Sequence, residues 1–182
     1  MSFKKLSPRE LCQISLFVAL IAIMAQIIIP MPLGVPMTMQ TFAVPLAGIL
    51  LGARKGTLAV LIYILIGVFG VPVFAGFTGG PALLVGPTGG FLLSFPLMAW
   101  FAGMGAEKNK KSWLIFGLAA GSLSNYFCGL VLYSILTHNN LYLSFMACVF
   151  PFIPTAIIKA IAAGILGSKL KKILSKTSLI SQ

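Results

Sequence analysis

The segment LCQISLFVALIAIMAQIII, residues 11–29, decides the fold class, because it is an uncharged apolar run close to the roughly 20 residues that a helix needs to cross a bilayer. It follows a basic stretch, as the core of a signal peptide would, but it is longer than the usual core of about 7–15 residues. No Ala-x-Ala cleavage pattern lies around Ala22 or Ala25. We therefore expect this segment to stay in the mature protein as a transmembrane helix.

The composition of the whole chain supports a membrane protein. Of its 182 residues, 59% are hydrophobic and 8% are charged, and the mean hydropathy is +1.05. A soluble domain carries a charged fraction of about 25%. The net charge of +11 would suggest nucleic-acid binding in a soluble protein, but here the basic residues cluster between apolar runs, as topology signals and lipid contacts do. We find no linker, so we expect a single membrane domain over residues 1–182.

Five more apolar segments follow the first, and together they predict an all-α polytopic membrane protein with six transmembrane helices. The second and fourth are shorter than a straight span needs, so they should tilt or lie inside the bundle. The expected spans are residues 11–29, 35–51, 57–73, 91–104, 113–136 and 141–170, the last with an interruption.

Basic residues occupy alternate connections between these spans, and the other connections carry no charge. The positive-inside rule then predicts that both termini are cytoplasmic in a multi-pass protein of the cell membrane. The basic residues concerned are Lys4, Lys5, Arg9, Arg54, Lys55, Lys108, Lys110, Lys111, Lys169, Lys171, Lys172 and Lys176.

Two uncharged connections on the expected outer side have unusual sequences. Residues 30–41 contain three prolines, which prevent a regular helix, and residues 72–90 are rich in glycine. Such backbone is tolerated at membrane depth where it is buried in protein or lines a cavity, and glycine lets it pack closely over a small molecule. Flexible solvent loops are the alternative. Because both connections are rich in Val, Phe and Met, we favour a ligand site.

Lys159 is the only basic residue inside an apolar segment and away from a segment end. A lone ammonium in hydrocarbon costs at least about 2.5–3.5 kcal/mol, so a partner is expected. The chain contains no Asp, and both Glu residues, Glu10 and Glu107, lie in basic flanks. Pro151 and Pro154 predict a broken helix that restarts before Lys159. The missing anion could be a ligand carboxylate; the alternative is that the lysine snorkels to an interface.

The remaining polar residues predict binding rather than catalysis. The single histidine, His138, has no partner for a metal site, and the cysteines form no Cys-x-x-Cys pair. Residues 52–57 lack both the glycine spacing of a phosphate-binding loop and its Gly-Lys-Ser/Thr ending. We therefore expect no enzyme activity and no cofactor, and any uphill transport must be driven by a partner. Asn125 and Tyr126 could equally bond neighbouring helices or contact a ligand.

Five stretches of the chain carry a family resemblance: residues 35–43, 48–52, 70–76, 86–91 and 151–160. They closely resemble the BioY family, the biotin-specific substrate-binding S components of energy-coupling factor (ECF) transporters. The resemblance covers essentially the whole chain in order. It implies a six-helix protein that captures biotin from the outside, while a transmembrane coupling protein and two ABC-type ATPases drive release inward.

The resemblance implies that Lys159 reaches the biotin carboxylate. The family motif commonly reads Pro-Gly-Asp-x-x-Lys, but here Ala156 replaces the Asp that faces the biotin ring and Thr155 replaces the Gly. Thr78 and Leu92 stand where some members carry Asn and Arg, so ring recognition must use other groups. The substrate-binding residues we predict are Lys159, Thr78, Gln40, Thr88, Asn125, Tyr126, Gly79, Phe74, Phe91 and Ala156.

The family docks its coupling partner through small residues of the first helix. Ser15 and Ala19 form a small-x-x-x-small pair here, and Ala22 lies one turn on. The resemblance implies that these residues dock the partner, although the same pattern could serve packing inside the bundle.

Other functions are compatible with the sequence. An S component for a different small carboxylate vitamin or precursor would explain the missing Asp. A stand-alone membrane facilitator would transport without ATPases and would need a polar path that the sequence does not show. An intramembrane enzyme lacks catalytic groups. Co-purification with ATPases would distinguish an S component from a stand-alone facilitator or an intramembrane enzyme.

Overall fold

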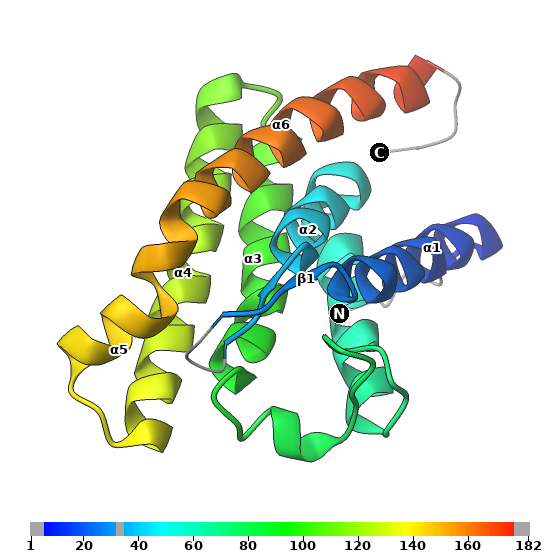
Figure 1. The fold of residues 1–182 in the computed structure, drawn as a ribbon. Helices are drawn as coiled ribbons and strands as arrows, with labels where there is room; N and C mark the ends of the chain where they lie inside the picture. Colours follow the sequence, from blue (N-terminus) through cyan, green and yellow to red (C-terminus); the bar gives the residue numbers. More distant parts are fainter. Residues whose placement is uncertain (1–5, 32–34, 177–182) are drawn as a thin grey trace, which may run out of the picture.

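The computed structural model describes residues 6–31 and 35–176, so Lys4, Lys5 and part of the first predicted loop lie outside the described residues. The chain is a mostly helical bundle (Figure 1). Its helices are α1 (Pro8–Ala25), α2 (Gln40–Val68), α3 (Gly89–Glu107), α4 (Lys111–Thr137), α5 (Leu141–Cys148) and α6 (Ile153–Lys176). Two 3-10 turns, η1 (Pro81–Leu83) and η2 (Phe150–Phe152), and two short strands, β1 (Ile28–Ile29) and β2 (Met37–Thr38), complete the described elements.

Within the described residues, five helical stretches are long and apolar enough to cross a bilayer: α1, α2, α3, α4 and the run from α5 to α6. The protein is therefore a multi-pass membrane protein. The second and third predicted spans, residues 35–51 and 57–73, are not separate helices joined by a loop. They form the two halves of α2, because the chain changes direction at a single residue.

That residue is Gly52, whose φ of 83° and ψ of 169° break the helix. This region of conformational space is accessible to glycine and costly for other residues. The break leaves the Ala53 N–H without a helical partner, and the Glu107 Oε1 at the end of α3 accepts its hydrogen bond at 2.8 Å. Glu107 therefore caps the second half of α2.

Helices α2 and α3 form the centre of the bundle because small residues let their backbones approach closely. A Cβ added at Gly48 would collide with the carbonyl oxygen of Ala99, and one at Gly103 would collide with the backbone of Ala53. Helix α4 meets α3 in the same way, since Gly117 lies against the Phe101 carbonyl. Such close approach is how helices gain packing energy within a membrane.

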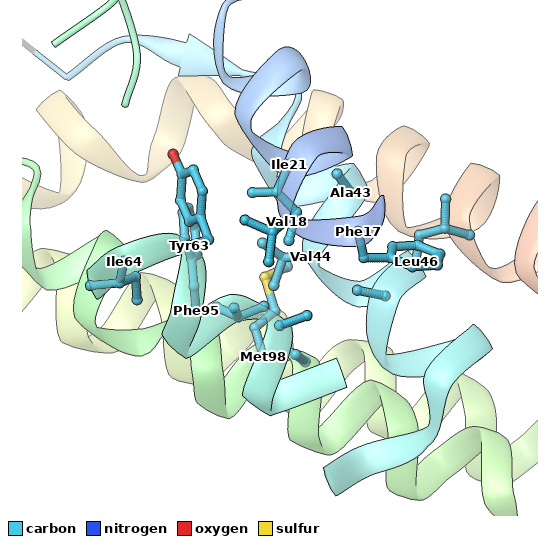
Figure 2. Packing of buried hydrophobic residues seen from close by; sticks show 14 of the residues in the cluster. Phe17, Val18, Ile21, Ala43, Val44, Leu46, Tyr63, Ile64, Phe95 and Met98 are labelled. Atoms are coloured by element: carbon cyan, nitrogen blue, oxygen red, sulfur yellow. The ribbon is translucent and has the colours of Figure 1, made fainter. Parts of the chain in front are cut away.

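Helix α1 starts with a capping box, in which the Ser7 side chain and the Glu10 side chain each bond the other residue's backbone N–H. Its buried face packs on α2 in the main hydrophobic cluster, where Figure 2 shows Val18 and Ile21 beside Val44. Figure 2 also shows Tyr63 at the edge of this cluster, with its hydroxyl pointing away from it. That hydroxyl belongs to the polar network of the ligand site.

The final membrane segment is broken as the sequence predicts. Helix α5 ends at Cys148, η2 contains Pro151, and α6 restarts at Ile153 with Pro154 in its first turn. In Figure 1 the connection from α2 to α3 and the connection from α4 to α5 lie at one end of the bundle. The α3–α4 connection and the end of α6 lie at the other end.

Candidate ligand-binding site

A cavity of about 310 Å³ lies at the end of the bundle that carries the long α2–α3 connection. This volume is at the lower end of the range for small-molecule sites. Its wall comes from the segments at either end of β2, from residues 74–88, from η2, and from helices α2, α3, α4 and α6. The lining residues are Val35, Pro36, Thr38, Gln40, Thr41, Phe74, Ala75, Thr78, Leu83, Gly86, Pro87, Thr88, Phe91, Leu92, Phe95, Asn125, Tyr126, Phe152 and Lys159.

Lys159 lies in the wall of the cavity, half-buried on α6. Its Nζ donates hydrogen bonds to the Thr38 carbonyl oxygen at 2.7 Å and to the Thr41 Oγ1 at 3.3 Å. An ammonium has three N–H donors, so these two bonds leave one donor for another acceptor. The neutral oxygens hold the ammonium in place without neutralising its charge.

No carboxylate of the described residues forms an ion pair with Lys159. The Glu10 Oε1 lies 3.3 Å from the Lys55 Nζ, and Glu107 caps Ala53. The chain has no other acidic side chain. The cavity therefore carries a positive charge that an anionic ligand could compensate.

Gln40 lies at the start of α2 and is 4% exposed. Its Oε1 accepts from the Thr38 Oγ1 at 2.9 Å, and its Nε2 donates to the Tyr63 hydroxyl at 2.7 Å. The Tyr63 hydroxyl in turn donates to the Val73 carbonyl oxygen at 3.1 Å. This network joins the strand that holds Lys159 to the loop on the other side of the cavity.

Asn125 projects from α4 towards α3 and is 1% exposed. Its Nδ2 donates to the Phe91 carbonyl oxygen at 2.9 Å and to the Ser94 Oγ at 2.8 Å. Both donors of this amide therefore serve helix packing, which was one of the two roles considered for this residue. The Tyr126 ring meets the Phe91 ring edge to face, with centroids 6.3 Å apart, and both rings line the cavity.

The loop after α2 is fixed at two points. Phe74 is 1% exposed and packs against Gly67, where any side chain would overlap its ring. Gln26, just after α1, donates from Nε2 to the carbonyl oxygens of Val73 at 3.4 Å and Phe74 at 3.1 Å, and its Oε1 accepts from the Phe77 N–H at 2.9 Å. The cavity wall is therefore tied directly to the end of α1.

The cavity brings together most of the residues predicted to contact substrate, although they are far apart in the sequence. Gly79 and Ala156 are not in its lining. Gly79 instead packs on the backbone of residues 70 and 71. Thr78 lines the cavity, but its hydroxyl donates to the Ala75 carbonyl oxygen at 2.9 Å within the loop. The predicted residues in the lining are Lys159, Thr78, Gln40, Thr88, Asn125, Tyr126, Phe74 and Phe91.

Thr38 and Thr41 were not predicted, although they are the direct partners of Lys159. They lie in the proline-containing stretch that the sequence marks as unusual. The contact between Thr38 and Lys159 joins residues 121 positions apart, so no local pattern could reveal it. The sequence showed two threonines beside Gln40 in an uncharged segment, which marks polar groups there but not their partner.

The fold and the cavity define a multi-pass helical membrane protein with a small-molecule site near one end of the bundle. The chain belongs to the BioY family, whose family model matches residues 1–176. The family resemblance expected from the sequence is thus confirmed.

Individual relatives match over nearly their whole lengths. A probable biotin transporter BioY of Pyrococcus horikoshii is 39% identical over 163 residues, which cover 90% of this chain and 96% of the relative. The biotin transporter BioY of Thermotoga maritima is 39% identical over 166 residues, covering 91% of this chain and 97% of the relative. A crystal structure of the S component for biotin from an ECF-type ABC transporter superposes with a TM-score of 0.84 at 26% identity, covering 92% of this chain and 95% of that one.

Proposed function

We propose that this protein is the biotin-binding S component of an ECF-type ABC importer. The observation that carries the proposal is Lys159, an ammonium in the wall of the cavity with no carboxylate partner among the described residues. Membership of the BioY family and the similarity to a biotin S component support biotin as the ligand.

The chemistry of the cavity suits the parts of biotin. Its carboxylate can pair with the Lys159 ammonium, a charge-assisted hydrogen bond stronger than a neutral one. Its apolar chain can lie against the aromatic walls, and its neutral ring can bond to neutral polar groups near the Gly-rich loop. Thr88 and backbone N–H groups are our candidates for the ring, because the Thr78 hydroxyl and the Asn125 amide donors are bonded within the protein.

The protein has no catalytic role in this proposal, and its energy comes from partners. A transmembrane coupling protein and two ABC-type ATPases would drive release of biotin inward. Ser15 and Ala19 are exposed on α1, which supports docking over internal packing for this pair. Ala22 is partly buried against the main hydrophobic cluster, so it would lie at the edge of the docking surface.

The orientation we propose is cytoplasmic for both termini, in the cell membrane. If each half of α2 spans separately, the five helical stretches become six crossings. The basic connections then lie on the cytoplasmic side, as the positive-inside rule requires. The cavity would face the outside, where biotin is captured.

Equilibrium binding to the purified chain in detergent tests the proposal. Biotin should bind tightly, and biotin amide, which lacks the carboxylate charge, should bind at least about tenfold more weakly because a charge-assisted bond is lost. Failure of both to bind would contradict the assignment.

A second candidate ligand is a different small carboxylate vitamin or precursor. The observation that favours it is Ala156, which stands where the family commonly carries the ring-facing Asp and does not line the cavity. Competition against labelled biotin by other carboxylate vitamins would identify such a ligand.

A further inference from the structure

A second cavity, of about 370 Å³, lies at the opposite end of the bundle from the ligand site. It is formed where the α3–α4 connection meets the last turns of α6, which Figure 1 shows at the same end of the molecule. Its lining residues are Ile49, Gly105, Ala106, Asn109, Lys110, Lys111, Leu114, Ser168, Lys171, Lys172 and Ser175.

The charge of this cavity is strongly positive. Four of its lining residues are lysines, from two separate parts of the chain, and none is acidic. The adjacent Glu107 uses its Oε1 to cap Ala53, and Glu10 pairs with Lys55. Glu107 is near enough to Lys171 to interact with it electrostatically. Within the described residues, neither carboxylate forms an ion pair with Lys110, Lys111 or Lys172.

The lining also has the hydrogen-bonding groups that a tetrahedral oxyanion needs. The Lys171 Nζ is held by the Ala106 carbonyl oxygen at 2.9 Å, which fixes its position and leaves two donors. Asn109 and Ser168 add neutral polar groups around the lysines, whereas the Ser175 hydroxyl donates to the Lys172 carbonyl oxygen at 3.0 Å. Lysine binds phosphate as a point charge, and hydroxyl groups complete its hydrogen bonds.

Residues beside the cavity are of the kinds that are common at the membrane–water interface. Trp113, two residues from Lys111, is 47% exposed, and the Lys108 Nζ lies 6.0 Å from the centre of its ring. Tryptophan is enriched at the membrane–water interface. Basic pockets between transmembrane helices at this level are typical sites for anionic headgroups. Ile49 and Leu114 contribute apolar groups to the cavity lining.

We propose that this lysine cavity binds a phosphate-bearing anion. The phosphodiester headgroup of an anionic lipid and free phosphate share this chemistry, and the cavity can accept it from either source. The site is separate from the biotin cavity and does not depend on what that cavity binds.

Native mass spectrometry of the full-length chain, released from micelles containing equal amounts of phosphatidylglycerol and phosphatidylcholine, tests this proposal. The test variant combines Lys111→Gln with Lys172→Gln. The control combines Lys169→Gln with Lys176→Gln, which removes the same charge from the same end of the protein but outside the cavity lining. Biotin binding by each variant confirms that it is folded.

The wild type should retain phosphatidylglycerol in preference to phosphatidylcholine. The test variant should lose this retention by about tenfold, and the control should keep most of it, because only the cavity lysines contact the headgroup. Equal loss in both variants would show diffuse attraction to basic surface and would overturn the proposal. The proposal would also be overturned if the wild type showed no preference for phosphatidylglycerol over phosphatidylcholine and bound no inorganic phosphate.

Inorganic phosphate distinguishes the two sources. It is added at millimolar concentration, with sodium chloride at matched ionic strength as the reference. Displacement of phosphatidylglycerol by phosphate alone supports a site open to soluble phosphate. Retention in both salts supports a lipid headgroup. Equal binding of phosphate by the test variant and the wild type would contradict binding in this cavity.

Discussion

Lys159 is held in the ligand cavity by neutral groups. A carbonyl oxygen and a hydroxyl accept two of its hydrogen bonds, and no carboxylate of the described residues forms an ion pair with it. Such an arrangement orients the ammonium before ligand arrives and leaves its charge for the ligand. Preorganisation of this kind lowers the cost of binding, since the side chain need not be ordered at that moment.

Gln26 should control how firmly the loop after α2 covers the ligand cavity. Gln26→Ala removes hydrogen bonds to Val73, Phe74 and Phe77, and each such bond is worth about 1 kcal/mol. We expect biotin to dissociate about tenfold faster or more, measured by stopped-flow release of a fluorescent biotin. The neighbouring Ile27→Ala, at a 51% exposed side chain, is the control. Equal release rates in wild type and Gln26→Ala would show that the loop is held by other contacts.

Ser144 is a buried hydroxyl that the structure leaves unsatisfied. Within the described residues its Oγ has no hydrogen-bond partner, although the residue is 0% exposed. Ser144→Ala should therefore leave the free energy of unfolding unchanged or raise it by about 1 kcal/mol, because a buried unpaired hydroxyl is costly.

Ser94→Ala is the matched comparison, because the Ser94 hydroxyl accepts from Asn125 and donates to the Gly90 carbonyl oxygen. It should destabilise by about 1–3 kcal/mol, as a buried amide loses its partner. Thermal unfolding of both variants in the same detergent measures the difference. If Ser144→Ala were as unstable as Ser94→Ala, the Ser144 hydroxyl would have to have a hydrogen-bond partner.

The break in α2 is an element-scale feature that one distant side chain supports. Glu107→Ala removes the acceptor for the Ala53 N–H, and loss of such a cap costs about 0.5–2 kcal/mol. We expect a lower unfolding temperature in detergent. Glu107→Gln keeps a side-chain carbonyl acceptor and should recover most of the loss. Equal stability of Glu107→Ala and the wild type would argue that another group satisfies this N–H.

The elements themselves were largely predictable, because the length of an apolar run sets where a membrane helix can form. The interruption before α6 was predictable from Pro151 and Pro154, which act locally. The break at Gly52 was not, since the signals around it, two glycines and two basic residues, equally suit a short loop. The break is capped by Glu107, which lies 54 positions away from Ala53. The sequence showed only that Glu107 lies in a basic flank, not which group it contacts.

At the scale of the whole molecule, α1 and α4 lie on opposite sides of the central helices (Figure 1). The proposed docking surface on α1 is therefore separate from the exposed apolar side of α4. Ala19→Trp should abolish ATP-driven biotin uptake in cells that contain the coupling module, while biotin binding by the isolated chain stays normal. Leu123→Trp, at a 69% exposed position on α4, should leave both intact. Normal uptake by Ala19→Trp would rule out docking through this face.

The ligand site was only partly predictable, because its residues come from distant parts of the sequence and meet only in the folded molecule. Lys159 was visible in the sequence, because a charge inside an apolar segment needs a partner. Its partners on β2 and α2 come from packing over more than a hundred positions, which the sequence pattern cannot encode. Asn125 was visible too, but whether it bonds α3 or a ligand depended on the approach of two helices.

The central claim is that Lys159 pairs with the carboxylate of biotin, and a four-way binding measurement tests it most directly. Biotin and biotin amide are titrated into the wild type and into Lys159→Gln, which keeps a donor for the Thr38 carbonyl. We predict that the variant loses about 2–5 kcal/mol for biotin, at least about 30-fold in Kd, and little for the amide. Equal losses for the two ligands, or unchanged biotin binding, would contradict the claim.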